Sequence, residues 1–229
     1  MFRSSDKKAC LPNLRNRRKA RRLPCFYKVT AYLSAELPDR KEPMDISQKL
    51  PAELSSVPEG AEIAILGAGC FWCIEAALGQ IDGIDSVISG YMGGSRENPS
   101  YEDICTGSSG HAEVVRVVFD PAKIDFERIL AWFWDLHDPT QLNRQGNDVG
   151  TQYRSVIFYT NALQKDIAEA SKEAAQKHFD RPIVTEISPA ETFYPAERYH
   201  QGYYFENKSR NGYCQFVVEP KLKKLNLKH

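Results

Sequence analysis

Long apolar runs are absent from this chain. No stretch approaches the roughly 18 consecutive apolar residues that a membrane-spanning helix needs. The first residues also lack the apolar core of a secretory signal peptide, because charged and polar side chains interrupt them. We therefore expect neither a membrane protein nor a secreted one.

Cysteines are few, and their spacing is not typical of a disulfide framework. The six cysteines stand at positions 10, 25, 70, 73, 105 and 214 of 229, and a chain of this length can bury a full core without cross-links. One Cys-x-x-Cys pair is half of a zinc site, and no second pair or histidine pair stands at ligand spacing. We expect no metal and a reducing compartment, with the cytoplasm as the location.

The formal net charge is zero, but the charge is unevenly distributed. Residues 1–43 hold twelve Lys and Arg against four Asp and Glu, and six positive charges fall within residues 15–22. Six prolines between positions 12 and 58 oppose long regular structure there. We predict a basic, disordered extension over residues 1–58 and one folded domain over residues 59–229. Organelle targeting and nucleic-acid binding are the functional alternatives for the extension, and we do not expect nucleic acid as a partner.

Apolar periodicity and capping residues predict mixed helices and strands after residue 60. The expected strands cover residues 63–66, 85–92, 111–119, 155–159 and 183–187. The expected helices cover residues 74–80, 125–137, 161–177 and 197–206, and residues from 221 onward are expected to form a basic tail. Because the elements do not follow a strict β-α repeat, we predict an α+β two-layer sandwich of ferredoxin-like type around one mixed sheet.

One stretch combines a strand, a glycine turn and a helix start with two thiols. It reads Gly67-Ala68-Gly69-Cys70-Phe71-Trp72-Cys73. The start of a helix favours an anion, so the pattern favours a Cys70 thiolate, with Cys73 one turn later on the same face. A dinucleotide turn is disfavoured because Trp72 stands where its third glycine should be. Two buried structural cysteines remain an alternative.

Glu113 is the second informative residue. Residues 113, 115, 117 and 119 share one face of a strand, and Glu113 is the one carboxyl on that apolar face. Burial there would raise its pKa, which a general acid near neutral pH needs. The alternative is a solvated Glu113 at the end of the strand.

Two tyrosines and an aspartate follow with weaker signals. Tyr91 precedes a Gly-Gly turn and Tyr153 precedes a strand, so either hydroxyl could hold an oxygen atom, although half-buried packing is the more frequent role. Asp148 lies in a loop, where a turn residue is the ordinary interpretation. We assign no role to His200.

Five ordered blocks over residues 61–220 resemble the peptide-methionine sulfoxide reductase A family. They are Gly69-Cys70-Phe71-Trp72, Gly90-Tyr91-x-Gly93-Gly94, Thr106-Gly107-x-x-Gly110-His111-Ala112-Glu113-Val114-Val115, Asn143-Arg144-Gln145-Gly146-Asn147-Asp148-x-Gly150-Thr151-Gln152-Tyr153-Arg154-Ser155, and Tyr199-His200-Gln201 with Gly212-Tyr213-Cys214. The resemblance implies that residues 59–229 are a catalytic domain that reduces the S-epimer of methionine sulfoxide, free and in proteins, and so repairs oxidised proteins.

The resemblance also implies roles for the site residues. Cys70 matches the nucleophile that becomes a sulfenic acid, and Glu113 matches the acid that protonates the sulfoxide oxygen. Phe71 and Trp72 match the walls around the substrate methyl group. Tyr91 and Tyr153 match the hydroxyls that hold the oxygen, and Asp148 matches a residue that organises the site.

The second thiol departs from the pattern of many family members. They have glycine where Cys73 stands and resolve the sulfenic acid through a C-terminal cysteine, whereas no cysteine follows Cys214 here. We therefore expect Cys73 to form the disulfide with Cys70, with Cys214 as the competitor. Thioredoxin, or dithiothreitol in vitro, is the implied reductant, with no bound cofactor, and we expect a monomer. The alternative enzyme class is a thioredoxin-like oxidoreductase, although no proline has the context of the cis-proline expected there.

Overall fold

The computed structural model describes residues 57–229. The predicted basic extension over residues 1–58 lies almost entirely outside the described residues. Within residues 57–229, no helix is both long enough and apolar enough to span a bilayer.

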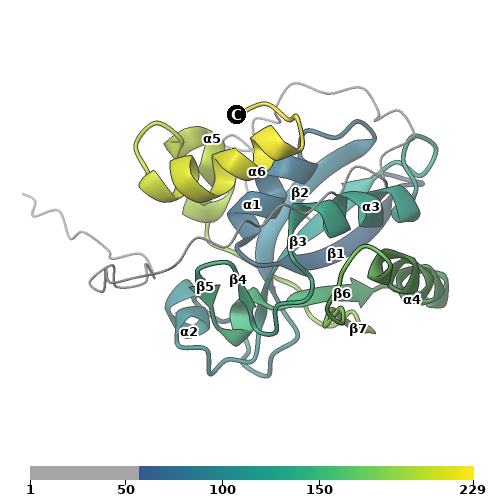
Figure 1. Ribbon diagram of the computed structural model, residues 1–229. Coiled ribbons are helices and arrows are strands. Elements are labelled where there is room, and N and C mark those ends of the chain that lie inside the picture. The colour runs from purple at the N-terminus through teal and green to yellow at the C-terminus, as the bar shows by residue number, and fades with distance from the viewer. Residues whose placement is uncertain (1–56) are drawn as a thin grey trace, which may run out of the picture.

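A six-stranded sheet lies at the centre of the described part of the chain (Figure 1). Its strands follow the order β7-β6-β1-β3-β2-β8, and all neighbours are antiparallel except the parallel pair β6 and β7. The bounds are β1 Glu62–Ala68, β2 Ile84–Met92, β3 Ala112–Phe119, β6 Ser155–Tyr159, β7 Glu186–Pro189 and β8 Tyr194–Pro195. A separate two-stranded ribbon pairs β4 (Arg144–Gln145) with β5 (Asp148–Val149). The prediction of an α+β fold around one mixed sheet is confirmed.

The longer helices begin where capping side chains stand. Asp125 accepts a hydrogen bond from the Arg128 amide at 2.7 Å, and Asn161 accepts one from the Gln164 amide at 2.9 Å. The predicted helices after these two caps are confirmed. The bounds are α1 Phe71–Leu78, α2 Tyr101–Cys105, α3 Phe126–Leu136, α4 Ala162–Gln176, α5 Tyr203–Asn207 and α6 Glu219–Lys224, with short helical turns at Thr151–Tyr153, Arg198–His200 and Cys214–Val218.

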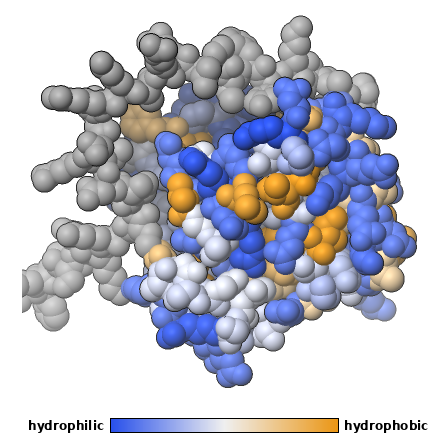
Figure 2. Space-filling model, turned by 60° about the horizontal axis from the view of Figure 1, so that its bottom comes forward, coloured by the Kyte–Doolittle hydropathy of each residue, from blue (hydrophilic) through white to orange (hydrophobic). Residues whose placement is uncertain are grey.

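The two faces of the sheet are covered differently. Helices α1 and α3 pack against central strands and enclose the main core, which receives Ala64 and Leu66 from β1. Ile65, between them, lies on the opposite face in a smaller apolar cluster with Val114 and Phe158, because side chains alternate along a strand. Figure 2, with the bottom of the Figure 1 view brought forward, shows apolar side chains in patches separated by hydrophilic ones.

Two expectations about the last third of the chain are wrong. A single helix over residues 197–206 does not form, because Gly202 adopts a left-handed conformation (φ 63°) between the turn Arg198–His200 and α5. The strand expected at residues 183–187 is instead β7, which begins at Glu186.

The expected basic tail is a third correction, because the C-terminus is part of the core. Helix α6 lies beside α1 in Figure 1, and the two helices are in contact. Leu222, Leu225 and Leu227 are all buried in the main core. The apolar spacing of these leucines outweighs the lysines between them, whose long side chains reach the surface.

Candidate active site

Cys70 lies at the junction between β1 and α1. It is the N-cap residue of α1, and the Cys73 amide donates to its carbonyl oxygen at 3.1 Å. The preceding Gly69 has φ of +84°, and a Cβ placed there would lie 2.6 Å from the Gln145 Cβ. Only glycine fits both conditions, so the tight turn that presents Cys70 depends on Gly69. Cys70 and Cys73 are both buried free thiols.

Glu113 is brought to the thiols by the pairing of the central strands. It lies opposite Tyr91 in the β2–β3 ladder, and its Oε2 accepts a hydrogen bond from the Phe71 amide at 3.1 Å. Its side chain is only 2% exposed, so the alternative of a solvated Glu113 is wrong. Burial raises the pKa of Glu113 to about 8, with the Asp148 charge adding to the shift. The predicted rise in pKa is confirmed, and burial favours the protonated form of Glu113.

The two thiols are hydrogen-bonded to each other, and their surroundings shift their pKa values in opposite directions. Burial raises the pKa of Cys70 well above its usual value, and the hydrogen bond to Cys73 and the Glu113 charge add to the rise. The hydrogen bond from Cys70 lowers the pKa of Cys73 to about 6 against the effect of burial, and the Lys221 ammonium contributes. Burial and a neighbouring carboxyl therefore oppose the Cys70 thiolate that the start of the eight-residue helix favours.

Asp148 is joined to Cys70 through Tyr213. The Tyr213 hydroxyl donates to Asp148 Oδ2 at 2.5 Å and is also within hydrogen-bonding reach of the Cys70 sulfur. Burial raises the pKa of Asp148, and the Tyr213 bond and the Lys221 charge oppose this rise. Asp148 therefore lies at the site as a buried group with a specific partner, and the interpretation as an ordinary turn residue is wrong.

The tyrosines lie in different environments. Tyr91 is fully buried, and its hydroxyl donates to Glu197 Oε2 at 3.0 Å. Tyr153, which ends the turn Thr151–Tyr153, has its pKa raised by burial and then by the charges of Glu113 and its neighbours. Tyr101, the first residue of α2, is acted on by the charges of Glu113 and Cys70 in the same way. Glu113 also acts on the Tyr91 hydroxyl, whereas both Glu113 and Cys70 act on those of Tyr101 and Tyr153.

Comparison with known proteins agrees with this arrangement. The family model described as peptide methionine sulfoxide reductase matches residues 62–229. The chain belongs to this family. Two relatives named peptide methionine sulfoxide reductase MsrA are those of Chromobacterium violaceum, 52% identical over 166 residues (72% of this chain and 94% of the relative), and Acinetobacter baumannii, 54% identical over 165 residues (72% and 94%).

Solved structures of the family have the same fold. The reduced form of Mxr1 from Saccharomyces cerevisiae is similar with a TM-score of 0.64 and 33% identity, covering 68% of this chain and 90% of that one. Methionine sulfoxide reductase A of Corynebacterium diphtheriae is similar with a TM-score of 0.61 and 34% identity, covering 73% of this chain and 82% of that one. The chain is therefore an oxidoreductase of the peptide-methionine sulfoxide reductase class, and the alternative of a thioredoxin-like oxidoreductase is wrong.

In this family member, aromatic rings surround the two residues after the nucleophile. Trp72 stacks on Tyr203 with ring centroids 3.8 Å apart and an interplanar angle of 7°. The ring of His200 lies beside those of Phe71 and Trp72, with ring centroids 5.2 Å and 5.6 Å apart. These contacts fix the indole of Trp72 and the ring of Phe71 in defined orientations.

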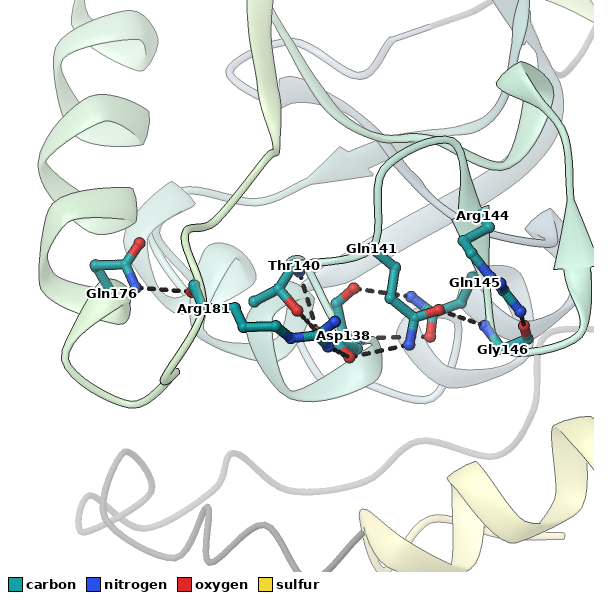
Figure 3. Close-up of polar contacts among 8 residues, drawn as sticks. All are labelled: Asp138, Thr140, Gln141, Arg144, Gln145, Gly146, Gln176 and Arg181. Atoms are coloured by element: carbon teal, nitrogen blue, oxygen red, sulfur yellow. Dashed lines mark hydrogen bonds and ion pairs between the residues drawn. The ribbon is translucent and has the colours of Figure 1, made fainter. Parts of the chain in front are cut away.

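A network of polar contacts holds the loop that carries Asp148 (Figure 3). The Asp138 carboxylate accepts hydrogen bonds from the Thr140 amide at 3.0 Å, from Gln141 Nε2 at 2.9 Å and from Arg181 at 2.9 Å. Gln145 Nε2 donates to the Asp138 carbonyl at 3.2 Å. The same loop therefore supplies Gln145 against Gly69 and Asp148 against Tyr213.

Several site residues were missed from the sequence. They are Tyr101, Glu197, His200, Tyr203, Tyr213 and Lys221. A signal existed for Tyr101, because Ser100 and Asp103 form a capping box that places Tyr101 at the start of a helix. The others reach the site only because the chain after β8 folds back over α1. Local patterns of helix and strand residues do not predict that packing.

The reductase site can attack an electrophilic sulfur and deliver a proton beside it. It places two thiols, those of Cys70 and Cys73, beside the Glu113 carboxyl, whose oxygen accepts from the amide of the residue after Cys70 and whose raised pKa favours the protonated form. Within residues 57–229, no group of three or more His, Cys, Asp and Glu side chains could hold a metal ion.

Proposed function

We propose that this enzyme reduces the S-epimer of methionine sulfoxide, free and in proteins, through a Cys70 sulfenic acid and a disulfide, and thereby repairs oxidised proteins. One observation carries the proposal: the protonated Glu113 carboxyl accepts from the amide of the residue that follows Cys70. A nucleophile and an acid placed side by side match the two needs of sulfoxide reduction, which are a bond to sulfur and a proton for oxygen.

In the first step Cys70 loses its proton to Cys73 and attacks the sulfoxide sulfur. The attack forms a bond between the Cys70 sulfur and the substrate sulfur, and Glu113 gives its proton to the sulfoxide oxygen. The hydroxyl then passes from the substrate sulfur to the Cys70 sulfur as the bond between the two sulfurs breaks. The products are methionine and the Cys70 sulfenic acid, so the substrate sulfur is reduced and the Cys70 sulfur is oxidised by two electrons. Phe71 and Trp72 contact the methyl group of the substrate, where a polar wall would leave unpaired groups.

The oxygen is held by hydroxyls. Tyr153 keeps the role proposed from the sequence, and Tyr101 is added because the charges of Glu113 and Cys70 act on its hydroxyl as well. Tyr91 is the weaker choice, since its hydroxyl already donates to Glu197. Asp148 organises the site by fixing Tyr213 next to Cys70.

In the second step Cys73 attacks the sulfenic acid. Cys73 gives up the proton that it took from Cys70, and its thiolate forms a bond to the Cys70 sulfur. The oxygen leaves as hydroxide and takes up that proton to become water. Two thiols of thioredoxin, or of dithiothreitol, then reduce the disulfide. Cys214 remains the competing thiol, because it is free, buried and near enough for the Cys73 charge to act on it.

The test supplies each epimer of methionine sulfoxide separately with dithiothreitol and measures the methionine formed. We expect turnover of the S-epimer, little or none of the R-epimer, and no product with either epimer in Cys70→Ser. Equal turnover of both epimers would contradict the stereochemical proposal. Product formation by Cys70→Ser would contradict the assignment of the nucleophile.

The remaining proposals concern the setting of the enzyme. We keep residues 59–229 as the catalytic domain, the cytoplasm as the location, thioredoxin as the partner and a monomer as the state in solution, with no bound cofactor. The strand order β6-β1-β3-β2, antiparallel throughout and with α1 and α3 as connections, supports the ferredoxin-like classification. Light scattering of the full chain measures the oligomeric state, and a dimer would contradict the monomer.

A further inference from the structure

Lys221 stands where the C-terminal helix meets the thiol pair. It is the third residue of α6, which packs against α1, and its side chain is half-buried. The Lys221 ammonium is within hydrogen-bonding reach of the Cys73 sulfur, and its charge also acts on Cys70 and Asp148. A lysine in the expected basic tail is therefore directed into the site.

Contacts on both sides of Lys221 fix this position. After α6, the Lys228 amide donates to Gln80 Oε1 at 2.8 Å, and Gln80 Nε2 donates to the Lys228 carbonyl at 3.2 Å. Within α6, Lys224 Nζ donates to the Asp135 carbonyl at 3.3 Å, and Leu222 is fully buried. The helix is thus fastened to the end of α1 and to α3, so its first turn cannot move away from Cys73 without breaking these contacts.

We propose that Lys221 is a positioning residue whose ammonium holds the Cys73 sulfur and keeps the Cys70–Cys73 pair singly ionised before substrate attack and before the disulfide forms. The proposal rests on the proposed function, in which both steps use this pair. The first step needs a base for the Cys70 proton, and the second needs Cys73 as a thiolate. A nearby ammonium stabilises the ionised form in both.

The electrostatic surroundings explain why a cation is needed there. The groups facing the pair or Lys221 are Cys70 and Cys73 themselves, Glu113 on β3, Asp148 on β5, Tyr213 and Cys214 after α5, and His137, Asp138, Asp135 and Lys224 around Lys221. Burial lowers the pKa of His137 to about 4, so that ring is neutral. Burial also lowers the pKa of Lys221, but its interactions with Cys73 and Cys70 outweigh this effect and leave the pKa raised. Lys221 therefore stays charged beside a thiolate that burial would otherwise neutralise.

A cavity of about 210 Å³ borders Lys221 and makes the conservative substitution informative. Trp134, His137, Gln145 and Lys224 also line it. An arginine at position 221 has room to extend into this space while keeping its positive charge. Methionine has the length of lysine without the charge, so the two variants separate charge from packing.

The test measures how fast iodoacetamide alkylates Cys70 and Cys73 in the reduced full-length enzyme between pH 5 and pH 10, with the sites separated by tandem mass spectrometry. We expect the transition for Cys73 near the pKa of about 6 in the unaltered enzyme. In Lys221→Met it should move upward by about 1 to 3 pH units, the usual effect of losing an opposite charge. In Lys221→Arg the pH of the Cys73 transition should stay close to that of the unaltered enzyme.

The control is Lys223→Met, two residues further along α6. Its ammonium pairs with Glu219 at the surface, so the alkylation profile should not change. A Lys221→Met profile equal to that of Lys223→Met would overturn the proposal. If Lys221→Met does not fold, as judged by circular dichroism, Lys221→Gln takes its place with the same expected shift.

A second readout follows methionine formed in the first turnover without reductant. Lys221→Met should be about tenfold slower than the unaltered enzyme at pH 6 and equal to it at pH 9, where the pair ionises unaided. An equal loss at both pH values would mean a structural role and would overturn the proposal. Alkylation needs no sulfoxide, so a failure of the proposed function appears separately as an unaltered enzyme that ionises normally but forms no methionine.

Discussion

The two halves of the site come from different parts of the chain. The first half, around Cys70 and Glu113, comes from β1, α1 and β3, whose strands pair directly in the central sheet. The second half, with His200, Tyr213 and Lys221, comes from residues after β8, which return over α1 as short helices. In the proposed mechanism the first half supplies the reacting groups, while the second half sets their charge and orientation.

The largest effect should come from Glu113→Gln, which tests the first half. Glutamine preserves the acceptor for the Phe71 amide but cannot release a proton, so methionine formation should fall by about 10² to 10⁴-fold. The activity of the unaltered enzyme should decline as the pH rises through about 8, since Glu113 then loses its proton. First-turnover rates between pH 5 and pH 10 check both points. An unchanged rate in Glu113→Gln, or a rate that rises above pH 8, would rule out Glu113 as the acid.

Cys73→Ser should separate the two steps. Serine cannot form the disulfide, so the variant should release about one methionine per enzyme and then stop when thioredoxin is the reductant. The burst of methionine and the thioredoxin-driven steady rate are measured in the same sample. Cys214→Ser is the matched control and should cycle normally. If Cys214→Ser stops after one turnover while Cys73→Ser cycles, the resolving thiol belongs to the second half of the site.

The features that could be predicted from the sequence belong mainly to the first half of the site and to single helices and strands. The confirmed features, such as the helices after Asp125 and Asn161 and the burial of Glu113, depend on neighbours in the chain or on side-chain alternation in one strand. The rise in the pKa of Cys70 was not predicted, since it depends on burial and on Glu113, 43 positions away in the sequence. Contacts between segments far apart in the sequence leave no periodic pattern, so local reasoning cannot find them.

Leu222→Ala tests whether the C-terminal helix is part of the fold. Leu222 is fully buried in the same core as Cys70 and Cys73, so the substitution leaves a cavity and should lower the free energy of unfolding by about 2 to 5 kcal/mol. Urea denaturation followed by tryptophan fluorescence measures the loss. Leu163→Ala on α4 is the control, because that side chain is 68% exposed and should change stability little. Equal stabilities of the two variants would mean that α6 is only loosely attached.

The smallest effect should come from Asn161→Ala, which alters a feature predicted from the sequence and far from the thiols in the chain. The Asn161 side chain caps α4 through the Gln164 amide, and removing such a cap costs about 1 kcal/mol. Asn161→Asp keeps the acceptor and should restore most of the loss in the same denaturation experiment. Both variants should reduce methionine sulfoxide at the unaltered rate, because α4 packs on α3, β6 and β7 and contributes no residue to the site. A loss of activity in Asn161→Ala without a loss of stability would show that the two halves of the site are coupled to α4 through the sheet.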